Sequence, residues 1–585
     1  MASSALPVST GAPSNGVHQS QQGQQGQQGQ QRAGGKRAFQ QGGRKNKKAK
    51  KRERDMKSGS HEEVLGLDIE ALLASQRSSP PAEGAGEETV AAGEVLPEPG
   101  SEIELDVVEL SSTGDGLAQQ KGFKQVYVVP FVVPGDTIKV KVYRHMTEGY
   151  TVADLISVLS PSPKRDDSRI QCKYFSKCSG CQFQMLDYSE QLRLKRRIVE
   201  KAFRNFSQLP PELIPAIQDT IGSPLQYNYR TKLTPHFDGP KGWFKRKNVQ
   251  PFESRPNVGF TPKGTSKTMD IEDCPIGTDA VRLGMKLERD RMDVEYAKYL
   301  RGGTILLRED TKRVKKDASS MPEDLALPTN AIKVEADHYV DYKTCITDNN
   351  GTSTEYIDDF VFKNSAGSFF QNNNSILPSF TEHIRQNVFP PTTGASADAS
   401  PNPIKYLIDA YCGSGLFTVT LSSVFESSTG IDIDPKGIQA ARMNAEANSV
   451  ASSRANFIAA DANELFKSVS YPPDETVVIL DPPRKGCDAN FLRQLLQYGP
   501  KRVVYVSCNV HTQARDVGML VRGEAGDGEE VVQVEGHKKI RYEIESLRGF
   551  DFFPQTGHVE GLALLNRVED DTTNASGVAD TSPTS

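Results

Sequence analysis

A cysteine at the end of an apolar segment is the residue best placed for covalent chemistry. Residues 503–506 are apolar and mostly β-branched, which predicts a short buried strand, and Cys508 follows ahead of a predicted helix over 512–520. In open α/β sheets, ligands bind beyond the carboxyl ends of the strands. A nearby helix N-terminus would favour the thiolate, the form of cysteine that attacks carbon. The alternative for a lone cysteine is a small buried hydrophobe.

Four other cysteines have a spacing that suits a metal site. Cys172, Cys178 and Cys181 lie within ten residues, and Cys274 follows much later, directly before a proline. Thiolates select either an iron–sulfur cluster or zinc. Structural zinc usually takes two Cys-x2-Cys pairs, and only one is present, so the spacing favours a cluster. Zinc and coincidental buried cysteines remain the alternatives.

Glycines and acidic residues after predicted strands suit a nucleoside cofactor. Gly413 and Gly415 follow a strand at 406–408, and Asp432 ends the next strand, where it could accept hydrogen bonds from a ribose. Asp461 follows the third strand, where an adenine amino group could bind. Thr418 stands where the dinucleotide fingerprint has its third glycine, which argues against NAD and is compatible with S-adenosylmethionine.

Two groups of predicted elements would carry these residues. Strands and helices alternate from about 404 to 566, which predicts a doubly wound, mostly parallel sheet of the α/β class. Short strands punctuated by turns between 102 and 159 predict a small five-stranded barrel of the oligonucleotide-binding kind, with a barrel that binds nothing as the alternative. Between these regions, 191–203 reads as an amphipathic helix that places Lys195 and three arginines on its polar side.

The composition separates tails from folded regions. Residues 1–99 combine a Gln/Gly tract, a basic run over 36–54 and an acidic Pro/Gly/Ala segment, which predicts disorder, as does the composition of 568–585. The net charge of −5 hides this basic arm, which is typical of a nuclear address or a nucleic-acid tether. No apolar stretch of the 585 residues could cross a bilayer, and no signal peptide is evident. We expect an intracellular protein of the nucleus, the cytosol or both.

Five motifs occur in an order typical of one enzyme family. They are Ser368-Phe369-Phe370-Gln371-Asn372-Asn373, Asp409-Ala410-Tyr411-Cys412-Gly413-Ser414-Gly415, Asp481-Pro482-Pro483-Arg484-Lys485-Gly486, Val506-Ser507-Cys508-Asn509 and Thr556-Gly557-His558-Val559-Glu560. By these motifs the chain resembles the RNA 5-methyluridine methyltransferases, S-adenosylmethionine-dependent enzymes that methylate uracil C5 in tRNA or ribosomal RNA. The resemblance runs from the barrel, which is similar to the RNA-binding TRAM domain, to about Arg567.

The resemblance implies a role for particular residues. Cys508 resembles the nucleophile and Glu560 the general base. Cofactor contacts are implied at five positions: Gln371, Tyr411, Asp432, Asp461 and Asp481. The four cysteines 172, 178, 181 and 274 resemble the ligands of the cluster-bearing members, in which a [4Fe-4S] cluster is expected. Ser179 replaces a more usual glycine between them, which need not disturb the ligand spacing.

The implied chemistry needs these residue types. Uracil C5 is too poor a nucleophile to take a methyl group unaided, so the Cys508 thiolate would attack C6 and push charge onto C5. A base such as Glu560 would then remove the C5 proton so that the thiol can leave. Asp481 could hold both the cofactor and the uracil edge. Because C6 is shielded in a stacked loop, we expect the target base to be flipped out.

The expected organisation has five parts: a disordered arm (1–99), a TRAM-like barrel (100–162), a central RNA-binding domain with the cysteine cluster (163–370), an S-adenosylmethionine-dependent methyltransferase domain (371–567) and a disordered tail (568–585). The nuclear-type arm looks eukaryotic, and eukaryotic family members with a barrel resemble tRNA enzymes, so the resemblance implies a monomeric enzyme that acts on tRNA, at the T-loop uridine 54, with ribosomal RNA as the alternative substrate. A non-catalytic RNA-binding or folding factor is a third hypothesis, and the intact Cys508 and Glu560 speak against it.

Overall fold

The computed structural model describes most of the chain. The described residues are 58–78, 96–240, 250–316, 329–391, 404–460, 466, 468–526 and 540–568. Most of the predicted disordered arm and nearly all of the predicted tail lie outside these ranges, as does Asp461. No helix among the described residues is both long and apolar enough to cross a bilayer.

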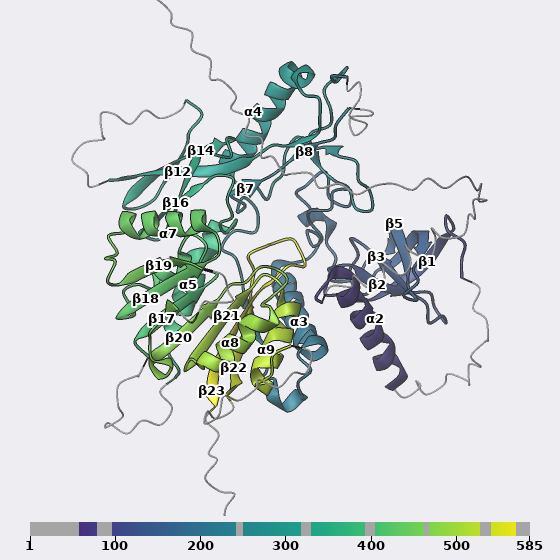
Figure 1. Ribbon diagram of the computed structural model, residues 1–585. Helices are drawn as coiled ribbons and strands as arrows, with labels where there is room; N and C mark the ends of the chain where they lie inside the picture. The colour runs from purple at the N-terminus through teal and green to yellow at the C-terminus, as the bar shows by residue number, and fades with distance from the viewer. Residues whose placement is uncertain are drawn as a thin grey trace, which may run out of the picture. The chain divides into compact units, whose positions relative to one another are not determined.

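An eight-stranded sheet carries the cofactor-type motifs. Its strands are β6 (Gln218–Ile221), β17 (Tyr406–Ala410), β18 (Ser427–Asp432), β19 (Ala455–Ala459), β20 (Thr476–Leu480), β21 (Arg502–Ser507), β22 (Arg541–Phe550) and β23 (Glu560–Val568). They are ordered β19-β18-β17-β20-β21-β23-β22-β6, and the first five run parallel while β23 is antiparallel to β21 (Figure 1). The prediction of a doubly wound, mostly parallel sheet is therefore confirmed.

Both faces of this sheet are buried, because alternate residues of each central strand enter different cores. Ile408 of β17 belongs to one apolar cluster and Leu407 to the other. The covering helices are α3 (Tyr188–Phe206), α5 (Leu377–Asn387), α6 (Leu416–Thr420), α7 (Pro435–Ala447), α8 (Ala489–Tyr498) and α9 (Val510–Arg522). A strand covered on both faces reads as a continuous apolar run, which is the pattern that the sequence shows in β20 and β21.

The predicted five-stranded barrel is also present. It consists of β1 (Glu102–Leu110), β2 (Gly116–Gln119), β3 (Val126–Val129), β4 (Thr137–His145) and β5 (Thr151–Ser160). The strands close in the order β1-β2-β3-β5-β4, so the barrel leaves no unpaired sheet edge. Its interior is filled by alternate apolar residues such as Leu105, Val107, Ile138 and Val140.

The central region contains structure that its weak periodicity did not predict. Helix α4 (Asp279–Glu295) packs on a sheet of β7 (Lys232–Leu233), β12 (Leu307–Lys315), β13 (Ile332–Glu335) and β14 (Tyr339–Ile346). A second small sheet holds β8 (His236–Phe237), β9 (Gly259–Phe260), β10 (Met269–Asp270) and β11 (Gly303–Thr304), and β15 (Thr352–Ile357) pairs with β16 (Phe360–Ser365).

Part of the predicted central domain belongs to the methyltransferase sheet instead. Strand β6 and helix α3 both lie within the predicted central domain, 163–370. In the structure, β6 pairs with β22 and α3 packs against α9. The prediction that Lys195 lies on the polar side of this helix is wrong, because its side chain is 0% exposed. Helical spacing puts it on the same face as the buried Gln191 and Ile198, which point to the core.

One segment of the predicted disordered arm is a helix, which corrects that prediction. Helix α2 (His61–Ser78) buries Val64, Leu65, Ile69 and Leu72. Ser60 accepts a hydrogen bond from the Glu63 N–H, so the helix begins with a Ser-x-x-Glu capping pattern ahead of its apolar residues. The low-complexity sequence on either side obscured this signal.

Candidate active site

The predicted nucleophile and base meet at one edge of the sheet. Cys508 directly follows β21, at the carboxyl end of that strand. Glu560 is the first residue of β23, and the antiparallel pairing sets Gly561 opposite Ser507. Glu560 therefore enters the sheet beside the end of β21. Asp481 follows β20, the other neighbour of β21, so three strands bring these residues together.

Hydrogen bonds join the Cys508 loop to the loop that carries Arg484. The Asn509 side-chain amide and the Thr512 hydroxyl both donate to the carbonyl oxygen of Arg484, at 3.0 and 3.2 Å. Asn509 also begins α9, because its side chain accepts a hydrogen bond from the His511 N–H. The Arg484 side chain, in turn, lies close enough to the Cys508 thiol for its positive charge to favour the thiolate. The two loops thus form one unit that presents a thiol and a guanidinium.

Folding places the thiol in an environment that opposes its ionisation. The pKa of Cys508 is raised to about 12, first by burial and then by the carboxyl groups of Glu560 and Asp481, which outweigh the lowering by Arg484. The helix N-terminus is expected to favour the thiolate, whereas removing an anion from water in this enclosed position favours the thiol. In the chain without RNA, burial of Cys508 therefore favours the protonated form.

Glu560 is a buried carboxyl group held without hydrogen bonds. It is 1% exposed, and neither carboxyl oxygen has a hydrogen-bond partner among the described residues. Burial and the neighbouring Asp481 raise the pKa of Glu560 well above its usual range. Burial, together with the charge of Asp409, also raises the pKa of Asp481. A raised pKa makes the ionised carboxylate of Glu560 a stronger proton acceptor, which suits a general base.

The glycine loop after β17 leaves open space for a ligand. Gly413 and Gly415 have φ angles of 53° and 89°, and a side chain on Gly413 would meet nothing within 4 Å. Asp432 at the end of β18 fixes this loop, because its carboxylate accepts hydrogen bonds from the Gly413 and Asp434 N–H groups at 2.9 and 2.8 Å. A carboxylate has further lone pairs, so Asp432 can still accept from ribose hydroxyls.

Of the other predicted cofactor residues, the structure describes the surroundings of Gln371 and Tyr411 but not of Asp461. Gln371 is 8% exposed, in a loop that Lys232 holds by donating to the Gly367 and Ser368 carbonyl oxygens. The Tyr411 ring packs against Phe491, with ring centroids 5.2 Å apart, so the core holds its side chain. Asp461 lies outside the described residues, and its predicted contact with adenine stays a prediction.

The four predicted cluster cysteines line a single cavity. Cys172, Cys178, Cys181 and Cys274 surround a volume of about 380 Å³ together with Arg484 and His558 of the catalytic edge. Among the residues that the structure describes, no three His, Cys, Asp or Glu side chains are grouped as ligands of one metal ion. A tetrahedral zinc site would need sulfur atoms about 3.8 Å apart. The thiols converge, but they do not form a ready-made zinc site.

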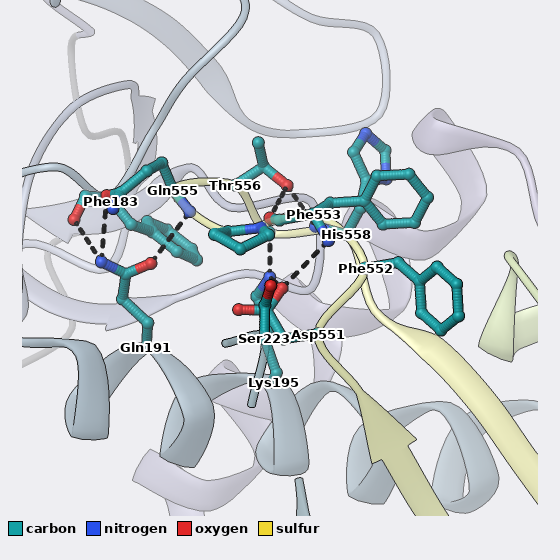
Figure 2. A network of polar contacts seen from close by, with 12 residues as sticks. Phe183, Gln191, Lys195, Ser223, Asp551, Phe552, Phe553, Gln555, Thr556 and His558 are labelled. Carbon is teal, nitrogen blue, oxygen red and sulfur yellow. Dashed lines mark hydrogen bonds and ion pairs between the residues drawn. The ribbon is translucent and has the colours of Figure 1, made fainter. Parts of the chain in front are cut away.

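A polar network fixes the segment that leads into Glu560. Lys195 of α3 pairs with Asp551 and donates to the Phe553 carbonyl oxygen at 2.9 Å, and Figure 2 shows its side chain pointing up into this segment. Gln191, one turn earlier, donates to Gln555 and accepts from its N–H at 3.1 and 3.0 Å (Figure 2). No local pattern predicts these pairs, because their members lie more than 350 positions apart.

The strand order and the glycine loop define the S-adenosylmethionine-dependent methyltransferase fold. A tRNA (uracil-5-)-methyltransferase family model matches residues 357–568. A tRNA (uracil(54)-C(5))-methyltransferase of Schizosaccharomyces pombe is 41% identical over 95% of this chain and 92% of its own length. The chain belongs to the tRNA (uracil-5-)-methyltransferase family.

A second relative supports this placement, and a solved structure shows the fold. The protein of the same description from Saccharomyces cerevisiae is 39% identical over 79% of this chain and 73% of its own length. The crystal structure of Pyrococcus abyssi tRNA (uracil-54, C5)-methyltransferase in complex with S-adenosyl-L-homocysteine has a TM-score of 0.52 and 23% identity. It matches 79% of this chain and all of that chain, and the likeness shows the fold.

Proposed function

We propose that the chain transfers a methyl group from S-adenosylmethionine to C5 of uridine 54 in tRNA. The observation that carries this proposal is the meeting of the Cys508 thiol with the unpartnered carboxyl group of Glu560 at the carboxyl edge of the sheet. A thiol and a proton acceptor on one side of a flipped base are what a reversible addition and elimination at uracil requires.

The residues divide the reaction into three steps. The Cys508 sulfur loses its proton to solvent and forms a bond to C6, and the C5–C6 pair of electrons becomes an enolate. When bound, S-adenosylmethionine supplies an electrophilic methyl group, which C5 takes. Glu560 then accepts the proton from C5, those electrons reform the C5–C6 double bond, and the sulfur leaves C6. The Arg484 guanidinium lies near the thiol, and its positive charge stabilises the sulfur anion.

The cofactor would lie along the glycine loop. The open space at Gly413 and the carboxylate of Asp432 support binding of the amino-acid and ribose parts, with Gln371 and Asp481 as further contacts. Asp461 is proposed for the adenine amino group on the strength of its position after β19.

Trapping with 5-fluorouridine tests the proposal directly. Fluorine at C5 cannot be removed as a proton would be, so RNA with 5-fluorouridine at position 54 should stay attached to residue 508 after methyl transfer. A Cys508→Ala chain should bind the RNA and form no adduct. Full methylation of tRNA by the Cys508→Ala chain would overturn the mechanism. Separate tRNA and ribosomal RNA pools in the methylation assay decide the substrate.

We propose further that Cys172, Cys178, Cys181 and Cys274 hold a [4Fe-4S] cluster as a structural group. The four thiols around one cavity support this, since a four-iron cluster spreads its cysteine ligands farther apart than one zinc ion does. The cluster would fix the cavity wall next to Arg484 and His558. Anaerobic reconstitution should give about four irons per chain, and a Cys274→Ser chain should lose iron that a matched Cys345→Ser chain keeps.

The remaining features complete the proposal. The closed barrel is proposed to be a TRAM-type module that grips RNA, and the protein is proposed to act as a monomer. The basic run over 36–54 suits a nuclear address or an RNA tether, so we propose residence in the nucleus, the cytosol or both.

A further inference from the structure

The turn before α2 lies against the catalytic loop. The Gly59 carbonyl oxygen accepts a hydrogen bond from the Asn509 side chain at 3.4 Å, directly next to Cys508. Gly59 has a φ of 71°, and a methyl group added to it would lie 2.5 Å from Cγ2 of Thr512. The backbone therefore approaches this corner more closely than any residue with a side chain could.

The two residues that Gly59 touches also hold the Arg484 loop. Asn509 and Thr512 both donate to the Arg484 carbonyl oxygen, as described above. A displacement of Gly59 would thus be passed through these two side chains to the loops that carry Cys508 and Arg484.

Helix α2 holds this turn from two directions. Val64 is buried in the core of the methyltransferase domain, whereas Leu65, Ile69 and Leu72 pack on the barrel residues of a separate apolar cluster. Asp68, 1% exposed, accepts hydrogen bonds from the backbone and side chain of Ser112. Helix α2 is therefore bound to the barrel and to the catalytic domain at the same time.

Hydrogen bonds hold the turn at the N-terminus of α2. Ser60 and Glu63 fix the turn itself, because Glu63 accepts from the Gly59 N–H at 2.6 Å. The turn is a rigid cap of the helix with Gly59 at its tip.

We propose that α2 and its capping turn position the catalytic loop, with Gly59 as the point of contact. The proposal rests on the function proposed above, and it assigns a positioning role to a segment upstream of the barrel. Gly59 touches neither RNA nor cofactor in this account. It acts through Asn509 and Thr512, which set where the Cys508 sulfur and the Arg484 guanidinium lie.

Two glycine substitutions in the full-length chain test this role. Gly59→Ala drives a methyl group into Thr512 and places alanine at a φ of 71°, whereas the control Gly66→Ala adds the same group on α2, where nothing lies within 4 Å and φ is not left-handed. We expect Gly59→Ala to lower the single-turnover rate of methyl transfer about 10- to 100-fold, as a misplacement near 1 Å does, with KM for tRNA changed less than twofold. Gly66→Ala should keep the wild-type rate.

A second-site change separates positioning from general damage. Thr512→Ser removes only the clashing methyl group and keeps the hydroxyl that donates to Arg484. The double variant Gly59→Ala with Thr512→Ser should therefore be measurably faster than Gly59→Ala, although alanine at the left-handed φ of 71° keeps it below the wild-type rate. A double variant as slow as Gly59→Ala, or a Gly59→Ala chain that raises KM without slowing single turnover, would overturn the proposal.

One readout is independent of methylation. Iodoacetamide labelling of Cys508, followed by peptide mass spectrometry, should be at least threefold faster in Gly59→Ala than in Gly66→Ala, because a displaced loop exposes the sulfur. Equal labelling and equal transfer rates in the two variants would refute the positioning role. If the wild-type chain methylates no RNA, the proposed function fails, and the labelling comparison alone decides this proposal.

Discussion

The buried pair of Lys195 and Asp551 provides a quantitative test of how the segment before Glu560 is held. Both side chains are 0% exposed, and Asp551 also accepts from the Phe553 N–H at 3.1 Å. The substitution Asp551→Asn keeps the shape and that acceptor but leaves the Lys195 ammonium without a counter-charge. Removing one partner of a buried pair costs about 3–5 kcal/mol.

The stability lost in Asp551→Asn cannot exceed the free energy of deprotonating Lys195, because Lys195 can lose its proton instead of staying charged. That free energy depends on pH. From an unfolded pKa of about 10.4, deprotonation costs about 4.6 kcal/mol at pH 7 and about 1.9 kcal/mol at pH 9. Burial already lowers the pKa of Lys195 in the folded chain, and removing Asp551 lowers it further. The unfolded chain then binds more protons than the folded chain, so stability rises with pH and the deficit of Asp551→Asn shrinks toward pH 9.

The measurement is urea unfolding at pH 7 and pH 9, followed by hydrogen exchange of peptides from α3 and β22. We expect Asp551→Asn to lose about 3–4.6 kcal/mol at pH 7 and less than about 2 kcal/mol at pH 9. The double variant Lys195→Met with Asp551→Asn should recover most of the loss, since no buried charge remains. Asp219→Asn, the same change in the exposed pair with Arg196 on α3, should have no measurable effect.

A loss below about 1 kcal/mol at pH 7 would refute this reasoning, as would a deficit that grows with pH. The same variants report on function. Because the segment from Asp551 leads into Glu560, Asp551→Asn should slow turnover, whereas Asp219→Asn should not.

Three further predictions follow from the site. With a pKa of about 12 in the free chain, Cys508 should be alkylated by iodoacetamide at a rate that rises about tenfold per pH unit from pH 7 to 9, whereas a plateau near pH 7 would mean a preformed thiolate. Glu560→Gln should let methyl transfer proceed but block removal of the C5 proton, so that turnover falls about 10²- to 10⁴-fold and an RNA–protein adduct accumulates on denaturing gels; normal release would remove Glu560 from the role of base. Asp432→Ala removes the acceptor of the Gly413 and Asp434 N–H groups and should weaken S-adenosylmethionine binding about 10- to 100-fold in calorimetry, and unchanged affinity would place the cofactor elsewhere.

The sequence determined the local elements and the types of residue that carry chemistry. Apolar runs such as 503–506 predicted buried strands, and the alternation with helices predicted the sheet, because a strand covered on both faces needs no polar side. The position of Cys508 at a strand end was readable for the same reason. Its neighbour Glu560 entered through motif resemblance, since a lone carboxylate near a strand start has no periodic signal.

Tertiary structure decided everything that depends on distant partners. The pKa of Cys508 is raised because folding encloses the thiol beside Glu560 and Asp481, neither of which is its neighbour in sequence. Lys195 is buried because α3 covers the sheet and Asp551 meets it across 356 positions. Helix α2 is stabilised by packing on the barrel and the catalytic core. Its short Ser-x-x-Glu capping pattern therefore indicates where the helix begins but does not predict what it packs against. Local sequence sets propensity, whereas desolvation and the pairing of charges exist only once the chain has folded.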